Sequence, residues 1–449
     1  MKTGTSAAGF RPSLRRWLLA LREPVPALVL AFLGGALVIL VTSGSFSAVA
    51  AAYGGLVDGA FFKTRGLSET LVATTPYIFL GLALAVGFEA GLFNIGVEGQ
   101  YIVGAMSAAW AGSWFTAVPA IAHLPLALGA GALGGALWAL IPAWLKAKTG
   151  AHEVINFIMM NFIAFRLTEY VVSGPLRDPQ ASAVQTARVS ANAELWSLHQ
   201  VPEHLGDPLN AFGVALVCAL LAWRFAARRG ARVQGPGCGA SPWRQRLWPA
   251  AAGGSVGIAV FLGVGPLARA WWPFADRHDR LHIGIVFALA AAAAVRWLVR
   301  RTTVGFEMRM LGANPEAARY AGVDVTRCLL VTLAISGALA GLAGGIEVLG
   351  VSTCRCLPLF FSSGYGFESV AIALLAHNNP LGIVFGSFVF GAMRNGADFM
   401  ELHSGVSKDV ISIIQGLVLL FVAAPALGLR FLKAKAGAAG VPPRNGGAG

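Results

Sequence analysis

Charged residues are scarce in this chain of 449 residues: only 12% are Asp, Glu, Lys or Arg, while 56% are hydrophobic. Soluble domains carry about 25% charged residues, so the composition excludes an ordinary soluble protein and predicts a polytopic membrane protein. The net charge of +13 does not indicate nucleic-acid binding, because the chain has no soluble basic domain to hold such a surface. We therefore expect no nucleic-acid partner.

Motifs for ATP hydrolysis and for metal catalysis are missing. No Gly-Lys dipeptide occurs, so the chain has no P-loop and cannot hydrolyse ATP itself. No H-E-x-x-H motif and no Cys-x-x-Cys pair is present, and the eight histidines are isolated. Cys354 and Cys356 form a C-x-C without a nearby histidine to complete a metal site. The sequence favours a non-enzymatic protein with no catalytic residue, metal site or cofactor of its own.

Apolar runs long enough to cross a bilayer of about 30 Å recur along the chain. They predict spans at 26–49, 70–91, 99–118, 123–145, 154–173, 210–226, 249–271, 281–299, 328–350, 361–377, 380–396 and 408–426. The polar break His377–Pro380 leaves two alternatives for 361–396, two short crossings or a re-entrant hairpin. We expect an all-α transmembrane bundle of 10–12 spans, with broken or re-entrant helices and both termini in the cytoplasm.

The basic residues agree with this map. Most of them fall in segments predicted to be cytoplasmic, and the largest external loop, 174–209, holds only Arg177 and Arg188. Cytoplasmic loops of membrane proteins carry this excess. The predicted organisation is a basic cytoplasmic N-terminus (1–25), a transmembrane domain (26–430) and a cytoplasmic tail (431–449), in the bacterial inner membrane.

Glycines recur at four-residue spacing within three of the predicted spans. They are Gly131 and Gly135, then Gly337, Gly341 and Gly345, then Gly382 and Gly386. This spacing lets helix backbones approach closely in a membrane. We expect these glycines to pack helices within one subunit rather than between two.

A short polar stretch in the cytoplasmic loop 302–327 reads as a capped helix. Asn314 is a good N-cap, Pro315 suits the first helical position, and Glu316 favours the positive N-terminal end. Gly322 can end the helix in a left-handed conformation. A small rigid helix in such a loop indicates docking to a soluble partner.

Several polar side chains lie in or beside the apolar spans. The pathway candidates among them are Asn94, Glu98, Gln100, Asn156, Asn161 and Glu368. A charge at mid-bilayer costs roughly 2.5–3.5 kcal/mol, so such residues usually face a cavity or a partner. The segments Phe93–Gly99 and Gly364–Pro380 also mix glycine with polar residues, as in the broken helices of transporters. The alternatives are helix caps and tight turns at the membrane surface.

Four stretches together resemble the membrane permeases of ABC importers, in the subgroup that handles nucleosides and simple sugars and is related to ribose and branched-chain amino-acid permeases. They are Gly91–Gln100, His152–Asn161, Gly312–Gly322 and Gly364–Gly382. The resemblance covers most of 70–173 and 280–426. Such permeases typically have about ten spans, so 210–271 looks like an inserted pair of spans.

The resemblance implies a coupling role for the cytoplasmic loop. The loop resembles the form of the E-A-A-x-x-x-G coupling element found in this permease subgroup. The residues that correspond to it are Gly312, Asn314, Pro315, Glu316, Ala317, Ala318 and Gly322. The implied partners are an ABC ATPase subunit that binds the ATP, a second identical or similar permease, an extracytoplasmic binding protein or lipoprotein, and membrane lipids. Ala317, Ala318 and Ala321 would present a small face for close insertion into the ATPase.

For the substrate we favour a nucleoside, in particular a purine nucleoside, over a simple sugar such as ribose. Both are neutral and polyhydroxylated, so they need hydrogen-bonding side chains rather than a fixed counter-charge. A different class, an ion-coupled secondary transporter, would use Glu98, Glu153 and Glu368 as an ion site and would need no coupling helix. A membrane scaffold without transport would need no broken polar helices.

Overall fold

The computed structural model of the chain describes residues 24–206, 279–362 and 364–423, with scattered positions between 212 and 258. These residues form an all-α structure; the pairing in the described ranges is limited to isolated β-bridges such as Gln185 with Pro358. The predicted termini 1–25 and 431–449, and the inserted pair of spans at 210–271, fall almost wholly outside the described residues.

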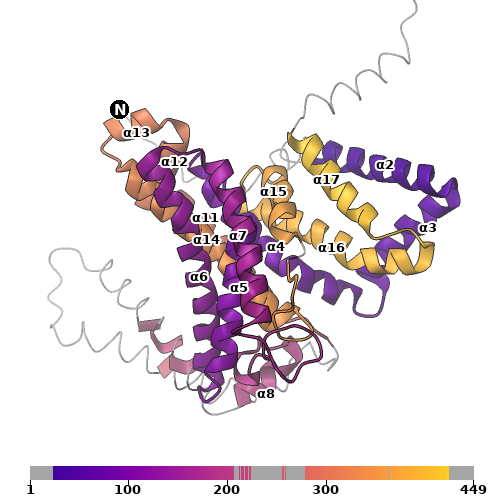
Figure 1. Cartoon of the computed structure of the whole chain (residues 1–449), viewed down its shortest axis with the longest axis horizontal. Helices are drawn as coiled ribbons and strands as arrows, with labels where there is room; N and C mark the ends of the chain where they lie inside the picture. Colours follow the sequence, from indigo (N-terminus) through magenta and orange to yellow (C-terminus); the bar gives the residue numbers. More distant parts are fainter. Residues whose placement is uncertain are drawn as a thin grey trace, which may run out of the picture.

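The helices follow the apolar runs closely (Figure 1). They are α2 (Pro24–Ser43), α3 (Phe46–Val57), α4 (Gly66–Glu89), α5 (Val97–Trp114), α6 (Ala120–Thr149), α7 (Glu153–Ser173), α8 (Val201–Gly206), α11 (Gly284–Arg301), α12 (Thr303–Ala313), α13 (Pro315–Tyr320), α14 (Val325–Ile346), α15 (Tyr365–Leu375), α16 (Pro380–Ser404) and α17 (Asp409–Ala423). Within the described ranges, α2, α4, α6, α7 and α14 with its following turn are long and apolar enough to cross a membrane. The predicted all-α membrane bundle is confirmed.

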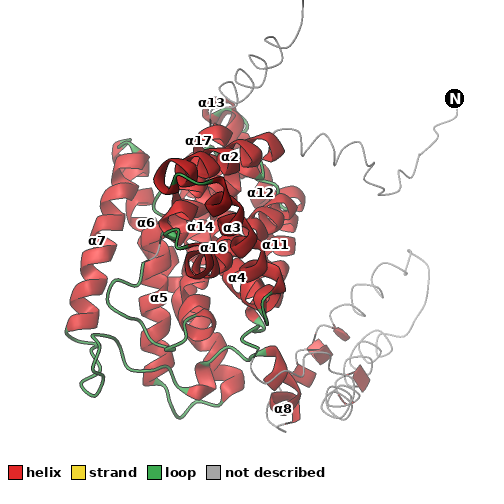
Figure 2. Ribbon diagram, turned by 90° about the vertical axis from the view of Figure 1, so that its right-hand side faces the viewer, coloured by secondary structure: helices red, strands yellow, loops and turns green. Residues whose placement is uncertain are grey.

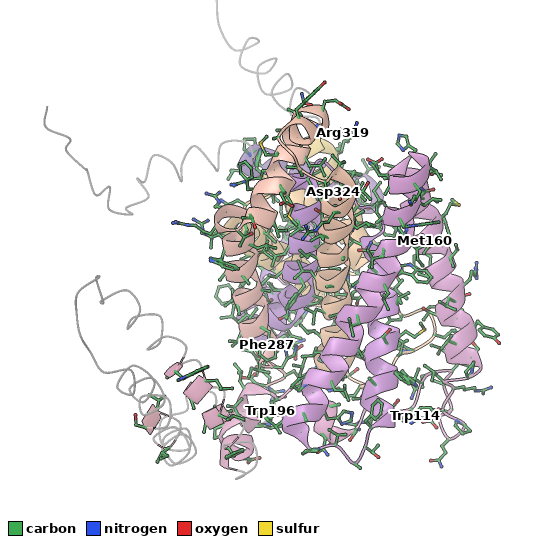
Figure 3. The ribbon with its side chains drawn as sticks, turned by 90° about the vertical axis from the view of Figure 1, so that its left-hand side faces the viewer. Trp114, Met160, Trp196, Phe287, Arg319 and Asp324 are labelled. Atoms are coloured by element: carbon green, nitrogen blue, oxygen red, sulfur yellow. A yellow bond between two sulfur atoms is a disulfide. The ribbon has the colours of Figure 1, made fainter. Side chains whose placement is uncertain are left out.

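Two groups of helices share α4. On one side α14 packs against α4, α5 and α6, and α5 also packs on α6. On the other side α4 packs on α16, which contacts α3, while α2 pairs with α17 (Figure 1). Helix α7 lies at the edge, beside α5 and α6 (Figure 2). The charged end of the bundle carries α13 with Arg319, while Trp114 and Trp196 lie at the opposite end (Figure 3). The positive-inside rule assigns the α13 end to the cytoplasm.

The glycine spacing packs helices within this subunit, as predicted. A Cβ built on Gly341 would lie 3.0 Å from both the carbonyl carbon of Gly131 and the Cα of Gly135. On Gly337 it would lie 3.0 Å from the carbonyl carbon of Gly135. Backbones this close leave no room for side chains, so α14 and α6 meet along a glycine seam.

Several predicted spans are interrupted. The run 26–49 is not one helix, because Gly44 turns the chain at φ +67° and Ser45 caps a new helix, α3. The last turn of the 328–350 run is π-helical, Glu347–Val351. Helix α15 has only 11 residues, about 16 Å, which is half a membrane.

The segment 361–396 runs from the external-loop end of the bundle to the α13 end and back. Before α15 the chain pairs with the external loop, since the Thr186 nitrogen donates to Leu357 over 3.0 Å. After α15, Asn378 and Pro380 lie beside Arg296 and Arg300 at the cytoplasmic end of α11. Non-helical chain and the half-length helix α15 form the first leg, and the 25 residues of α16 form the second, an arrangement that favours two crossings over a re-entrant hairpin.

Candidate functional site: buried polar residues beneath the capped helix α13

The predicted capped helix in the cytoplasmic loop is α13. The Asn314 side-chain oxygen accepts hydrogen bonds from the nitrogens of Glu316 (2.9 Å) and Ala317 (3.1 Å), so two N-terminal donors of the helix are satisfied. Gly322 ends it with φ +83°, a conformation that glycine adopts without strain. The caps were predicted correctly from the sequence.

The predicted face of three small alanines on α13 is wrong at one residue. Ala318 is fully buried and faces the protein's own interior, so it cannot belong to a face that inserts into a partner. The other two predicted alanines, Ala317 and Ala321, are exposed. Beside them on the surface lie Glu316 and Arg319, which form an ion pair at 3.7 Å, and Tyr320, whose surface is 90% exposed. An exposed tyrosine on a rigid helix is a typical anchor at a protein interface.

The loop that carries α13 rests on the break between α4 and α5. A Cβ built on Gly312 would lie 2.9 Å from the Gly91 nitrogen, and one built on Gly91 would lie 3.1 Å from the Gly312 Cα. Only glycine fits on both sides of such a contact. Gly91 itself has φ +71°, so it also supplies the turn that ends α4.

Just past this turn, Asn94 and Gln100 join their side-chain amides through two hydrogen bonds of 3.0 Å. Asn94 also donates to the Ser336 hydroxyl of α14 over 2.9 Å, and Ser336 donates to the Ala83 carbonyl of α4 over 2.6 Å. All three side chains are buried. The broken segment is thus tied to both helices that flank it.

Asn161 of α7 binds the same segment. Its side-chain oxygen accepts from the Gly99 nitrogen over 2.8 Å, and its amide nitrogen donates to the Ile95 carbonyl over 3.0 Å. Asn156, one turn earlier, has a buried amide nitrogen without a hydrogen-bond partner among the described residues. A role of these residues in lining the substrate path stays a prediction.

Glu98 joins α5 to α15. Its buried carboxylate accepts from the Gly366 nitrogen over 2.5 Å and from the Ser362 hydroxyl. A carboxylate on the first N–H groups of a helix satisfies donors that would otherwise be orphaned and interacts favourably with the helix dipole. Glu98 therefore caps α15 from another helix.

Glu368, the last predicted pathway residue, lies one turn into α15. It accepts from the Tyr77 hydroxyl of α4 and pairs with Arg394 of α16 at 3.4 Å. The Arg394 guanidinium also lies 4.0 Å from the centre of the Tyr365 ring, a cation–π contact. Sequence reasoning missed Arg394; its signal was a single charged residue within the apolar run of α16.

A cleft of about 320 Å³ opens between α5, α7 and the chain before α15. Its lining comprises Ile102, Phe162, Phe165, Arg166, Thr168, Glu169, Leu359, Phe360, Phe361 and Ser362. Arg166 and Glu169 form an ion pair at 2.6 Å. The sequence reasoning did not single out these two charges, although they interrupt an apolar span.

The external loop fixes the outer end of this chain segment. Cys354 and Cys356 form a disulfide, which the sequence reasoning did not predict. Arg355 between them has φ +51°, donates to the Gly350 carbonyl and pairs with Glu194 at 3.6 Å. Burial lowers the pKa of Arg355, and the neighbouring Glu194 carboxylate opposes this shift.

Comparison with known proteins matches residues 66–423 to the branched-chain amino acid transport system permease components. The chain belongs to this permease family. The permease is 34% identical to the guanosine ABC transporter permease protein NupP of Bacillus subtilis, over 92% of its own length and 95% of the relative's. It is 32% identical to the glucose ABC transporter permease protein TsgB13 of Haloferax volcanii (83% and 79%).

A third relative is the nucleoside ABC transporter permease protein NupB of Lactococcus lactis, 26% identical over 89% of the permease and 90% of the relative. No solved structure gave a significant match. The resemblance to ABC permeases of the nucleoside and sugar subgroup is confirmed, and the permease is a multi-pass membrane protein.

Proposed function

We propose that this permease forms the translocation pathway of an ATP-driven importer of nucleosides, with purine nucleosides as its main substrates. It works with a separate ABC ATPase, a second permease subunit and an extracytoplasmic binding protein, in contact with membrane lipids. It holds no cofactor and no catalytic site of its own, because ATP binds to the ATPase. Relatives named for guanosine and for nucleosides support the substrate class.

The contact between Gly312 and Gly91 is the observation that carries the mechanism. It places the coupling loop directly on the α4–α5 break, with no intervening side chain. Any movement of α13 on an ATPase therefore displaces the segment that begins at Gly91. That segment holds the hydrogen bonds of Asn94 and leads into Glu98.

Glu98 extends the connection to the second broken region. Because its carboxylate binds the Gly366 nitrogen and the Ser362 hydroxyl, a shift of the α5 N-terminus moves or releases the N-terminus of α15. Two broken helices in contact form an element that can adopt two arrangements, which is what alternating access requires. ATP-driven motion at α13 would select between them.

A simple sugar is the alternative substrate, favoured by the relative named for glucose. An ion-coupled transporter is less favoured, because Glu98 and Glu368 are already occupied by partners within the described structure. Uptake of guanosine, adenosine, ribose and glucose by the complete complex in proteoliposomes separates these possibilities. Uptake driven by an ion gradient in the permease alone would overturn the proposal.

Docking is tested separately with Gly322→Val and Glu316→Lys. A β-branched residue is strained at φ +83°, and the Lys reverses the charge at the helix N-terminus. We expect both variants to insert normally but to co-purify less ATPase, while Gly129→Val on α6, where a Cβ would meet no atom within 4 Å, keeps the wild-type amount. Unchanged co-purification and uptake in both variants would count against docking through α13.

A further inference from the structure

The exposed face of α7 combines apolar residues with one charge at membrane depth. Its exposed large side chains recur along one side of the helix, at Ile155, Met159, Phe162, Ile163 and Tyr170. Arg166 lies among them with 80% of its side chain exposed, about 20 Å along the helix from Glu153. An arginine there is costly against lipid, so this part of α7 borders polar surroundings.

The cleft beside Arg166 has the composition of a ligand site. Its volume of about 320 Å³ lies at the lower end of the range for small-molecule pockets. Four phenylalanines contribute flat apolar surfaces, namely Phe162, Phe165, Phe360 and Phe361. Phe360 is 77% exposed and has φ +58°, a strained conformation that proteins keep mainly at functional positions.

Thr168 gives independent evidence for a ligand. Its side chain lines the cleft, yet its hydroxyl oxygen is buried without a hydrogen-bond partner among the described residues. The residue as a whole is 6% exposed. A buried hydroxyl left unpaired costs about 1–3 kcal/mol, and a polar group of a bound molecule would remove this cost.

We propose that this cleft is a substrate subsite that takes the planar base of a nucleoside against the phenylalanine rings and its ribose hydroxyls at Thr168, Arg166 and Glu169. The inference rests on the proposed function. Stacking uses the flat face common to all bases. Arg166 can donate hydrogen bonds to the oxygen of a ribose hydroxyl, and Glu169 can accept hydrogen bonds from such hydroxyls. Because Arg166 and Glu169 neutralise each other, the site suits an uncharged substrate.

The same cleft connects through Ser362 to the buried polar residues that hold the two broken helices, in particular Glu98. Ser362 lines the cleft, and its hydroxyl donates a hydrogen bond to Glu98. Glu98 in turn caps α15. A substrate hydroxyl that accepts a hydrogen bond from the Ser362 hydroxyl takes this donor away from Glu98. Occupancy of the cleft would thereby weaken the link between α5 and α15.

The test measures guanosine uptake by the complete complex in proteoliposomes, normalised to the amount of assembled complex. We expect Phe162→Ala and Phe360→Leu to raise the KM for guanosine at least about five-fold, the loss expected for one stacking contact. The matched control Phe287→Ala, on α11 outside the cleft, should change KM less than about two-fold. Phe360→Leu keeps an apolar side chain without the flat ring, so it separates stacking from simple filling of space.

A second arm tests the hydroxyl contacts. Wild-type permease should prefer guanosine over its 2′,3′-dideoxy analogue. Thr168→Val, which replaces the hydroxyl with a methyl group of similar size, should narrow that preference at least about three-fold. If the wild-type complex takes up guanosine normally and every cleft variant has the same KM as Phe287→Ala, the subsite is wrong but the proposed function stands. No guanosine uptake by the wild-type complex would overturn the proposed function and the subsite with it.

Discussion

Substituting Gly312 tests the contact between the coupling loop and the α4–α5 break. A methyl group at this position would lie 2.9 Å from the Gly91 nitrogen and 3.1 Å from the Ala90 carbonyl carbon. Both are backbone atoms, which cannot rotate away as a side chain can. Gly312→Ala must therefore separate the loop from the break, and overpacking of this kind costs about 1–3 kcal/mol.

This cost acts only on arrangements in which the two backbones touch. If transport passes through such an arrangement, its population falls about 5- to 150-fold at 1–3 kcal/mol, and ATP-driven uptake falls with it. The cap at Asn314 is untouched, so the ATPase should still bind and hydrolyse ATP. We expect an assembled complex whose ATP hydrolysis is no longer matched by uptake.

The assay compares initial uptake rate and ATPase rate in the same proteoliposomes. Gly129→Ala is the matched control, because a Cβ there meets no atom within 4 Å. A thermal unfolding scan detects a variant that is simply misfolded. Uptake by Gly312→Ala within two-fold of Gly129→Ala, at equal stability, would refute the idea that force passes through this contact.

Three further predictions concern the cap, the carboxylate and the glycine seam. Asn314→Ala leaves two helix donors without an acceptor, at a cost of about 1 kcal/mol, so about five-fold less ATPase should co-purify at limiting concentration. Glu98→Leu strands the buried Gly366 N–H and should lower the melting temperature by several degrees more than Glu98→Gln, whose amide can serve both partners; equal values would contradict the capping role. Gly341→Val should lower the melting temperature of the bundle much more than the control Gly129→Val does, because a Cβ at position 341 would lie 3.0 Å from α6 backbone atoms.

Helix positions were predictable from the sequence because the bilayer sets a minimum length for an apolar run. Helix α7 begins at Glu153 and ends at Ser173, one residue from the predicted 154–173. The breaks were harder to predict. The run 26–49 is interrupted around Gly44 by the polar residues Thr42, Ser43 and Ser45, a turn signal that the span prediction passed over, and the observed φ of +67° places the break there.

The carboxylates and amides among these buried polar residues, such as Asn94, Glu98 and Glu368, were predictable because polar side chains at membrane depth are rare, but Arg394 was missed. Their partners were not, since Asn94 and Ser336 are 242 positions apart and Glu98 and Gly366 are 268 apart. Ala318 shows the same limit. Its helix was predicted, but the side that faces inward depends on how α13 packs on its neighbours.

The partners also change what the polar residues do. Glu98 and Asn161 each bind backbone groups of a broken segment, Gly366 in one case and Ile95 and Gly99 in the other. In a membrane a break in a helix survives only when its freed N–H and C=O groups find partners. These side chains therefore hold the breaks together in this conformation, and a break that moves during transport must exchange those partners. The substrate can supply new hydrogen-bond partners. A substrate hydroxyl in the cleft that takes the Ser362 donor from Glu98 thereby changes how α15 is held, without touching α15 itself.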